Sequence, residues 1–262
     1  MGVIDMFSSD ICKLKKAKYL VLVPILIDLF TLFVSNVILK IAYIPINRTL
    51  LFKLGIISSP PSIRYILEDF PSVIFGYTSI KGYTGLISGV SLFTILLLLS
   101  AILVGSFIDS AYLSTLEKVN FEKVNLKYFF ILGNRNWWKF LVLRIISFIP
   151  VVLMLYKSSF IALSFVMVIF YYVKFSIVMD EVSLKENFRN GLSFFMNNLG
   201  LSVKIIFFCG FVFSLASTVI FLLTTNIPLY GVVFSIITVA FLGVKINKTV
   251  IELYRNYSKF TQ

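Results

Sequence analysis

Residues 205–244 read IIFFCGFVFSLASTVIFLLTTNIPLYGVVFSIITVAFLGV, and this stretch decides the fold. Its forty residues include no Lys, Arg, Asp or Glu, and a turn signal, TTNIP at 224–228, interrupts them near the middle. The hydrocarbon core of a bilayer is about 30 Å thick, so a helix needs roughly 20 apolar residues to cross it. The stretch therefore predicts two membrane-crossing helices joined by a short turn.

The composition of the whole chain points the same way. Its 262 residues are 59% hydrophobic and 14% charged, whereas a soluble domain is about 45–50% apolar and about 25% charged. We therefore expect an all-α, polytopic integral membrane protein that forms a single membrane domain over residues 1–262. The net charge of +12 fits lysines and arginines beside helix ends better than a nucleic-acid surface, so no nucleic-acid partner is expected.

Further apolar stretches extend the prediction to about six transmembrane helices. We place the passes at residues 19–39, 83–112, 138–156, 158–179, 201–224 and 228–246. Three segments that mix charged and apolar residues predict two or three interfacial amphipathic helices, at 2–17, 118–133 and 184–198, although the first also fits an ordinary charged flank. Residues 40–82 fit an outer loop, an interfacial segment or a re-entrant segment.

Local signals mark the ends of the interfacial helices. Ser183 and Glu186 match the S-x-x-E capping box, which predicts a helix start at 184. Gly133 followed by Asn134 predicts the end of the helix at 118–133. Trp137 and Trp138 follow directly, and we expect them to be anchors at the membrane–water boundary.

The distribution of Lys and Arg predicts the orientation. If the N-terminus is cytoplasmic, the cytoplasmic side receives four before the first pass, six from Lys118 to Arg144, four from Lys174 to Lys204 and four after Val244. That places 18 inside and leaves six outside. Because cytoplasmic flanks carry the excess of positive charge, we expect a multi-pass protein of the cell membrane with both termini in the cytoplasm.

Four charged residues fall within predicted passes, and they form our candidate site: Asp28, Asp109, Arg144 and Lys174. Such residues are costly in a membrane and usually face a protein interior or a cavity. Asp28 is nine residues beyond Tyr19, about 14 Å into the bilayer at the helical rise. A cluster in the cytoplasmic half would serve as a substrate or ion-coupling site; the alternative is structural ion pairing, with Lys174 extending to the interface.

Catalytic chemistry has little support in the sequence. The chain has no histidine, no GxSxG, no HExxH and no glycine-rich phosphate loop. Its two cysteines, Cys12 and Cys209, are too far apart in the sequence for a CxxC or zinc motif. We therefore expect a protein that is not an enzyme and that needs no metal or other cofactor.

Several segments together carry a resemblance to a known group. They are YLVLVPILIDL at 19–29, YFF at 128–130 with Gly133 ahead of the two tryptophans, and MDEVSLKENFRN at 179–190 ahead of NNLG at 197–200. The chain resembles prokaryotic six-helix membrane proteins that include YciC-like proteins and the membrane domain attached to some glycerophosphodiester phosphodiesterases. The resemblance implies a membrane-associated cytoplasmic helix within 182–200. It does not imply phosphodiesterase activity, which in that group belongs to a separate soluble barrel domain.

These observations lead to two expectations about function. The first is a membrane module that binds anionic lipid headgroups at its cytoplasmic face, or a protein partner or second copy of itself, in export or envelope homeostasis. The alternative is a small-solute or peptide transporter, or a permease subunit, that uses Asp28 and Arg144.

Overall fold

The computed structural model describes residues 18–38, 43, 45, 56–67, 69–72, 76–78, 82–84, 91–119, 126–156 and 160–258. The interfacial helix predicted at 2–17 lies outside these residues. Within them the fold is all-α apart from one small hairpin, in which β1 (Gly76–Thr78) pairs antiparallel with β2 (Gly82–Thr84). The helices are α3 (Lys18–Phe33) with the π-helical turn η2 (Val34–Ile38), the 3-10 helix η3 (Ile63–Tyr65), α4 (Leu92–Lys118), α5 (Leu126–Tyr156), α6 (Phe160–Met179), α7 (Leu184–Asn197), α8 (Leu199–Asn226) and α9 (Pro228–Ser258).

Within the described residues, four helical stretches are long and apolar enough to cross a membrane, and the chain is a membrane protein. They are Tyr19–Val37, α4, α8 and α9. Within α6, Val166–Met179 is a shorter apolar stretch. Four helices are therefore identified as spanning by their length and composition, and the total of six passes remains a prediction.

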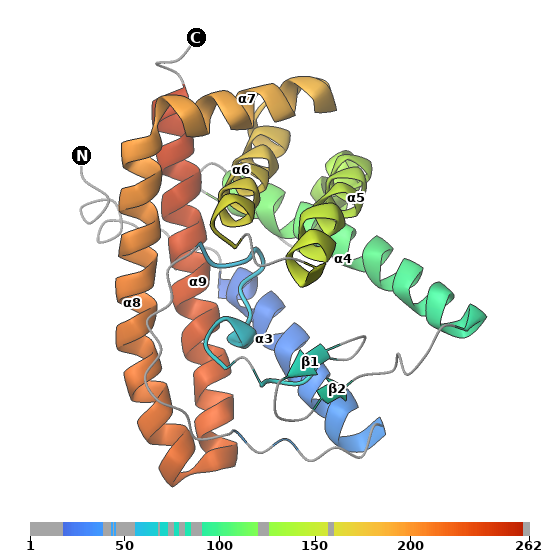
Figure 1. The fold of residues 1–262 in the computed structure, drawn as a ribbon, viewed down its shortest axis with the longest axis vertical. Coiled ribbons are helices and arrows are strands. Elements are labelled where there is room, and N and C mark those ends of the chain that lie inside the picture. The colour runs from blue at the N-terminus through green and yellow to red at the C-terminus, as the bar shows by residue number, and fades with distance from the viewer. Residues whose placement is uncertain are drawn as a thin grey trace. The chain divides into compact units, whose positions relative to one another are not determined.

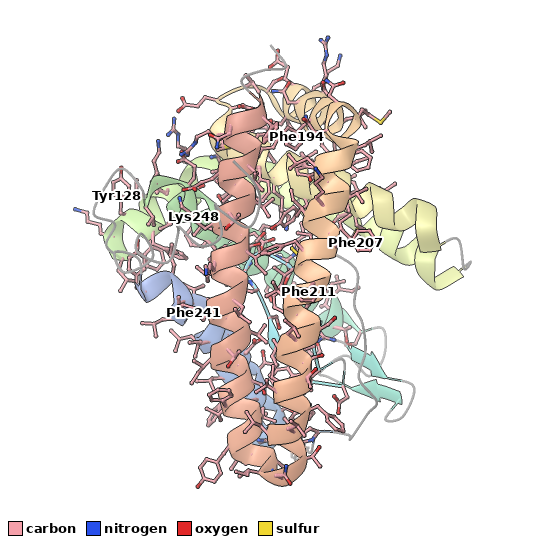
Figure 2. All side chains as sticks on the ribbon, turned by 90° about the vertical axis from the view of Figure 1, so that its left-hand side faces the viewer. Tyr128, Phe194, Phe207, Phe211, Phe241 and Lys248 are labelled. Carbon is pink, nitrogen blue, oxygen red and sulfur yellow. The ribbon has the colours of Figure 1, made fainter. Side chains whose placement is uncertain are left out.

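The stretch at 205–244 forms a helical hairpin. In Figures 1 and 2, α8 and α9 lie side by side. A tight turn joins them, because Ile227 N donates to Leu223 O at 2.8 Å and Gly231 N donates to Ile227 O at 2.7 Å. A Cβ at Gly231 would lie 2.7 Å from the Leu223 carbonyl oxygen, so the close approach of the two helices here requires glycine.

Helix α5 differs from the two separate segments predicted at 118–133 and 138–156. It is one helix from Leu126 to Tyr156, and Gly133 lies inside it. A Cβ at Gly133 would lie 2.7 Å from the Ala111 Cβ, and Ser110 Oγ donates to the Gly133 carbonyl at 2.8 Å. Gly133 thus allows α5 to pack closely on α4, and this tertiary contact outweighs the stop signal of the Gly-Asn pair.

The contacts within the described chain group it into two compact units. Unit 1 contains the described residues of Ile102–Ile205 and Asn247–Gln262; unit 2 contains those of Lys18–Ala101 and Ile206–Ile246. Each unit has its own polar sites. They are described separately below.

Candidate functional site

Three of the four predicted site residues meet in unit 1. Asp109 of α4 lies between two cations, with its Oδ2 atom 3.3 Å from Lys174 Nζ of α6 and 3.7 Å from Arg144 Nη1 of α5. Lys174 Nζ donates a hydrogen bond to this oxygen. The cluster therefore joins three consecutive helices and carries two positive charges against one negative charge.

A glycine on α4 provides the place where the Arg144 side chain lies. A Cβ at Gly105 would be 2.0 Å from Arg144 Nη1 and 2.5 Å from Cζ, so the guanidinium rests directly on the α4 backbone. One turn further along α4, Asp109 is within reach of the same group. The spacing of Gly105 and Asp109 thus fixes the position of the arginine head.

Both tryptophans lie on α5, and Trp137 contacts α4 near this cluster. Trp137 Nε1 donates to the Leu103 carbonyl at 3.2 Å, two residues before Gly105 on α4. Trp138 is 51% exposed. The contact of Trp137 with α4, two residues from Gly105, makes the tryptophan pair a useful spectroscopic reporter.

Asp28, the fourth predicted site residue, has its partners in unit 2. It is the central residue of the apolar span Tyr19–Val37, and its side chain is buried. Its carboxylate accepts hydrogen bonds from Ser62 Oγ and from Ile63 N, both at 2.8 Å. The carboxylate therefore binds the start of η3, which is the geometry of a helix cap supplied by another segment.

The segment that Asp28 binds is irregular and packed among helices. Ile63 and Phe70 belong to a buried cluster with Leu32 of α3 and with Val232 and Ile236 of α9. Further contacts join this segment to α8 and α9: the rings of Tyr65 and Phe213 are 4.9 Å apart, and a Cβ at Gly243 would lie 2.3 Å from Pro61 Cβ. Non-helical backbone at membrane depth is tolerated only where protein or a cavity surrounds it. The described part of residues 56–72 is thus packed among helices of unit 2.

Helix α7 begins with the predicted capping box. Ser183 Oγ accepts from Glu186 N at 3.3 Å, and Ser183 N donates to Glu186 Oε2 at 2.9 Å. The hydrogen bonds from the Ser183 hydroxyl and amide hold the pKa of Glu186 below its ordinary value. The carboxylate is therefore the stable form at the helix start.

One face of α7 packs into unit 1. Asn187, Gly191, Phe194 and Phe195 are buried. The Phe194 ring lies 4.8 Å from that of Tyr172 on α6, and Ser176 Oγ of α6 donates to Asn187 Oδ1 at 2.9 Å. These contacts fix which face of α7 remains outside.

The opposite face of α7 is exposed and changes character along its length. Lys185 and Arg189 are exposed at its first two turns, and Leu192 and Met196 follow on the same stripe with 47% and 59% exposure. Among the residues that the structure describes, neither cation forms an ion pair. We call these four residues the α7 stripe.

Sequence reasoning missed a buried charged region at the end of α9. The last pass, predicted to end at residue 246, continues as part of α9 to Ser258. Lys248 is 1% exposed, donates to the Leu116 carbonyl at 3.0 Å and lies 3.6 Å from Glu252 Oε1 (Figure 2). Arg255 pairs with Glu117 of α4. The signal was present, because no glycine or proline follows Gly243 and the charges recur at helical spacing.

The lipid-facing surface of unit 2 is apolar. Phe207 and Phe211 of α8 and Phe241 of α9 are 55%, 58% and 45% exposed (Figure 2). Large exposed aromatic side chains at helical spacing are expected where acyl chains are the solvent.

In the described part of the chain, no three His, Cys, Asp or Glu side chains come together as metal ligands. Neither a family model nor a curated protein nor a solved structure matches this chain. Function must therefore be argued from the sites themselves.

Proposed function

We propose that this chain is a non-enzymatic module of a prokaryotic cell membrane that binds anionic lipid headgroups at its cytoplasmic face, with six passes and both termini inside. A role in export or envelope homeostasis would suit such a module. The α7 stripe carries the proposal: two exposed cations are followed by two exposed apolar side chains on a helix whose other face is fixed by burial. An amphipathic helix of this kind lies in the headgroup plane.

Electrostatics gives the expected size of the effect. A Lys or Arg near an anionic surface contributes about 1 kcal/mol, which corresponds to a factor of about five in lipid preference. Leu192 and Met196 add apolar area that only an acyl layer or a protein surface would cover. A lipid that meets the whole stripe should therefore be anionic.

The test places a reporter on the stripe. Met196→Cys in a Cys12→Ser, Cys209→Ala background is labelled with an environment-sensitive fluorophore and placed in phosphatidylcholine vesicles containing about one third phosphatidylglycerol. Quenching by nitroxide-labelled phosphatidylglycerol, relative to nitroxide-labelled phosphatidylcholine, measures the lipid preference at α7. Lys185→Gln and Arg189→Gln should each lower this preference about fivefold.

Lys127→Gln is the matched control, because Lys127 is an exposed cation at the start of α5. It should leave the preference at residue 196 unchanged. Equal preference for the two lipids in the parent protein, or an equal effect of Lys127→Gln, would refute the role of the stripe.

One observation favours transport as a second candidate function. Asp28 is buried at the centre of an apolar span against an irregular segment, and interrupted elements at this depth form binding sites in many transporters. The test is labelling of Asp28→Cys with a membrane-impermeant thiol reagent in sealed, sided vesicles. Labelling from one side supports a water-filled path; no labelling, while Lys185→Cys in the same background reacts, rules that path out.

A further inference from the structure

The cluster of Asp109, Arg144 and Lys174 has an unbalanced charge. Among the described residues, Asp109 is the only carboxylate that pairs with either cation. The cluster therefore holds one net positive charge on helices that have few other charges along their apolar parts. Because an uncompensated charge is costly at membrane depth, an anionic partner would stabilise it.

Arg144 also has unused hydrogen-bonding capacity. Its Nη1 atom is buried and makes no hydrogen bond with any described residue. The Asp109 oxygen at 3.7 Å is beyond hydrogen-bond range and already accepts from Lys174. A guanidinium has five N–H donors in a planar fork that matches phosphate oxygens, so this head group can still bind an oxyanion.

The cluster is open on one side and its arginine is already positioned. The side chains of Arg144, Lys174 and Asp109 are 36%, 25% and 16% exposed, so an incoming group can reach part of each side chain, although not the buried Nη1 atom of Arg144. Gly105 sets where the guanidinium lies, because any side chain at that position would displace it. Preorganisation of this kind lowers the entropy lost on binding.

The depth of the cluster fits a phosphate group at the membrane boundary. Arg144 is six residues beyond Trp138, about 9 Å along the helix. Tryptophan favours the headgroup level, and Arg and Lys side chains extend toward it. A phosphate at the inner edge of the headgroup layer is therefore within reach of both cations.

We propose that Arg144 and Lys174 bind a phosphate group, with Asp109 as a positioning residue that holds the two cations together. The phosphate belongs either to a lipid headgroup or to a soluble phosphate compound. The site is separate from the α7 stripe, and lipid binding at either place can fail without the other.

The experiment uses the two tryptophans of the full chain, which both lie on α5 and of which Trp137 contacts α4 two residues from Gly105. In nanodiscs, quenching of tryptophan by nitroxide-labelled phosphatidylglycerol relative to phosphatidylcholine gives the local lipid preference. Arg144→Gln and Lys174→Gln should each reduce it about fivefold. Lys174→Gln leaves a neutral Asp–Arg pair and is the variant least expected to disturb folding.

Gly105→Ala separates geometry from charge. It keeps every charged residue and moves only the guanidinium, so it should reduce the preference as Arg144→Gln does. Lys185→Gln on the α7 stripe should leave the tryptophan signal unchanged even where it alters the signal at residue 196. The proposal is overturned if Gly105→Ala and Lys174→Gln both behave like the parent protein, or if Lys127→Gln has an equal effect.

A second arm identifies the source of the phosphate. Inorganic phosphate is titrated into nanodiscs of phosphatidylcholine alone, with chloride at equal ionic strength as the control. A tryptophan response specific to phosphate and lost in Arg144→Gln indicates a soluble ligand; a preference for phosphatidylglycerol that phosphate does not displace indicates a lipid. Absence of both responses refutes the site.

Discussion

The packing of α7 on α6 can be tested with one methyl group. A Cβ at Gly191 would lie 2.7 Å from Val173 Cγ2, 2.8 Å from Val173 N and 3.0 Å from Val173 Cα. Carbon atoms in ordinary contact are about 3.5–4.0 Å apart, so the methyl group in Gly191→Ala is about 1 Å too close. Two of the three atoms belong to the backbone and cannot rotate away, so α7 must move.

The expected loss of stability follows from two opposing terms. Overpacking costs about 1–3 kcal/mol, and the backbone contacts place this site in the upper half of that range. Alanine regains about 1 kcal/mol in helix propensity over glycine. We therefore expect Gly191→Ala to lower the free energy of unfolding by about 1–2 kcal/mol.

Gly200 of α8 provides the matched control, because it is exposed and a Cβ there would meet no atom within 4 Å. Gly200→Ala should leave stability unchanged or raise it by up to about 1 kcal/mol. The free energies are measured by titration with a denaturing detergent, and hydrogen exchange of the α7 amides locates the change. Shifts of the same sign and size in the two variants, or unchanged exchange in α7 of Gly191→Ala, would contradict the packing described.

Three further predictions concern polar contacts. Ser62→Ala removes one of the two hydrogen bonds to Asp28 and should lower the free energy of unfolding by about 1–2 kcal/mol in the same titration; Ser72→Ala, in the same segment, should change it by less than about 0.5 kcal/mol. The pKa of Glu186 is lowered in the folded state, so the stabilisation that its carboxylate gives to the start of α7 is complete above the ordinary glutamate pKa and is lost as pH falls through the lowered pKa. Hydrogen exchange of the first α7 amides should become faster over that pH range, and Glu186→Gln should abolish this pH dependence. Glu117→Gln removes the ion pair with Arg255, in which the side chains of Glu117 and Arg255 are only 10% and 21% exposed, and should lower the free energy of unfolding by about 2–4 kcal/mol. Glu181→Gln, which breaks an exposed pair with Arg135, should cost at most about 1 kcal/mol.

Signals confined to a few neighbouring residues were read correctly from the sequence. The apolar run at 205–244 with its central turn gave the α8–α9 hairpin, and the S-x-x-E pattern gave a helix that starts at Leu184. Both signals depend on neighbouring residues alone. A membrane-crossing helix needs about 20 consecutive apolar residues, and the free amides at a helix start need hydrogen-bond acceptors nearby. Such requirements leave a mark in the sequence itself.

Contacts between distant residues were not readable in the same way. Asp28 binds residues 34 and 35 positions away, and nothing near it in the sequence names Ser62 or Ile63 as partners. The sequence around Gly133 predicted the end of a helix, because it does not show that Gly133 packs against Ala111 of another helix. Asp109, Arg144 and Lys174 were predicted to cluster from their positions along three helices, and they do meet. The same reasoning had included Asp28, whose partners are Ser62 and Ile63.

The buried end of α9 bears on the predicted orientation. Three of the four cations counted after Val244 are not free flanking charges, since Lys245 and Lys248 are buried and Arg255 pairs with Glu117. If these three are left out of the 18 cations assigned to the cytoplasmic side, 15 remain against six outside. The excess is still more than twofold, so the prediction of cytoplasmic termini does not depend on this end of the chain. It depends mainly on the segments before Arg144 and between α6 and α8, where Lys185 and Arg189 are exposed, and these are the cations that the α7 stripe would present to anionic lipid.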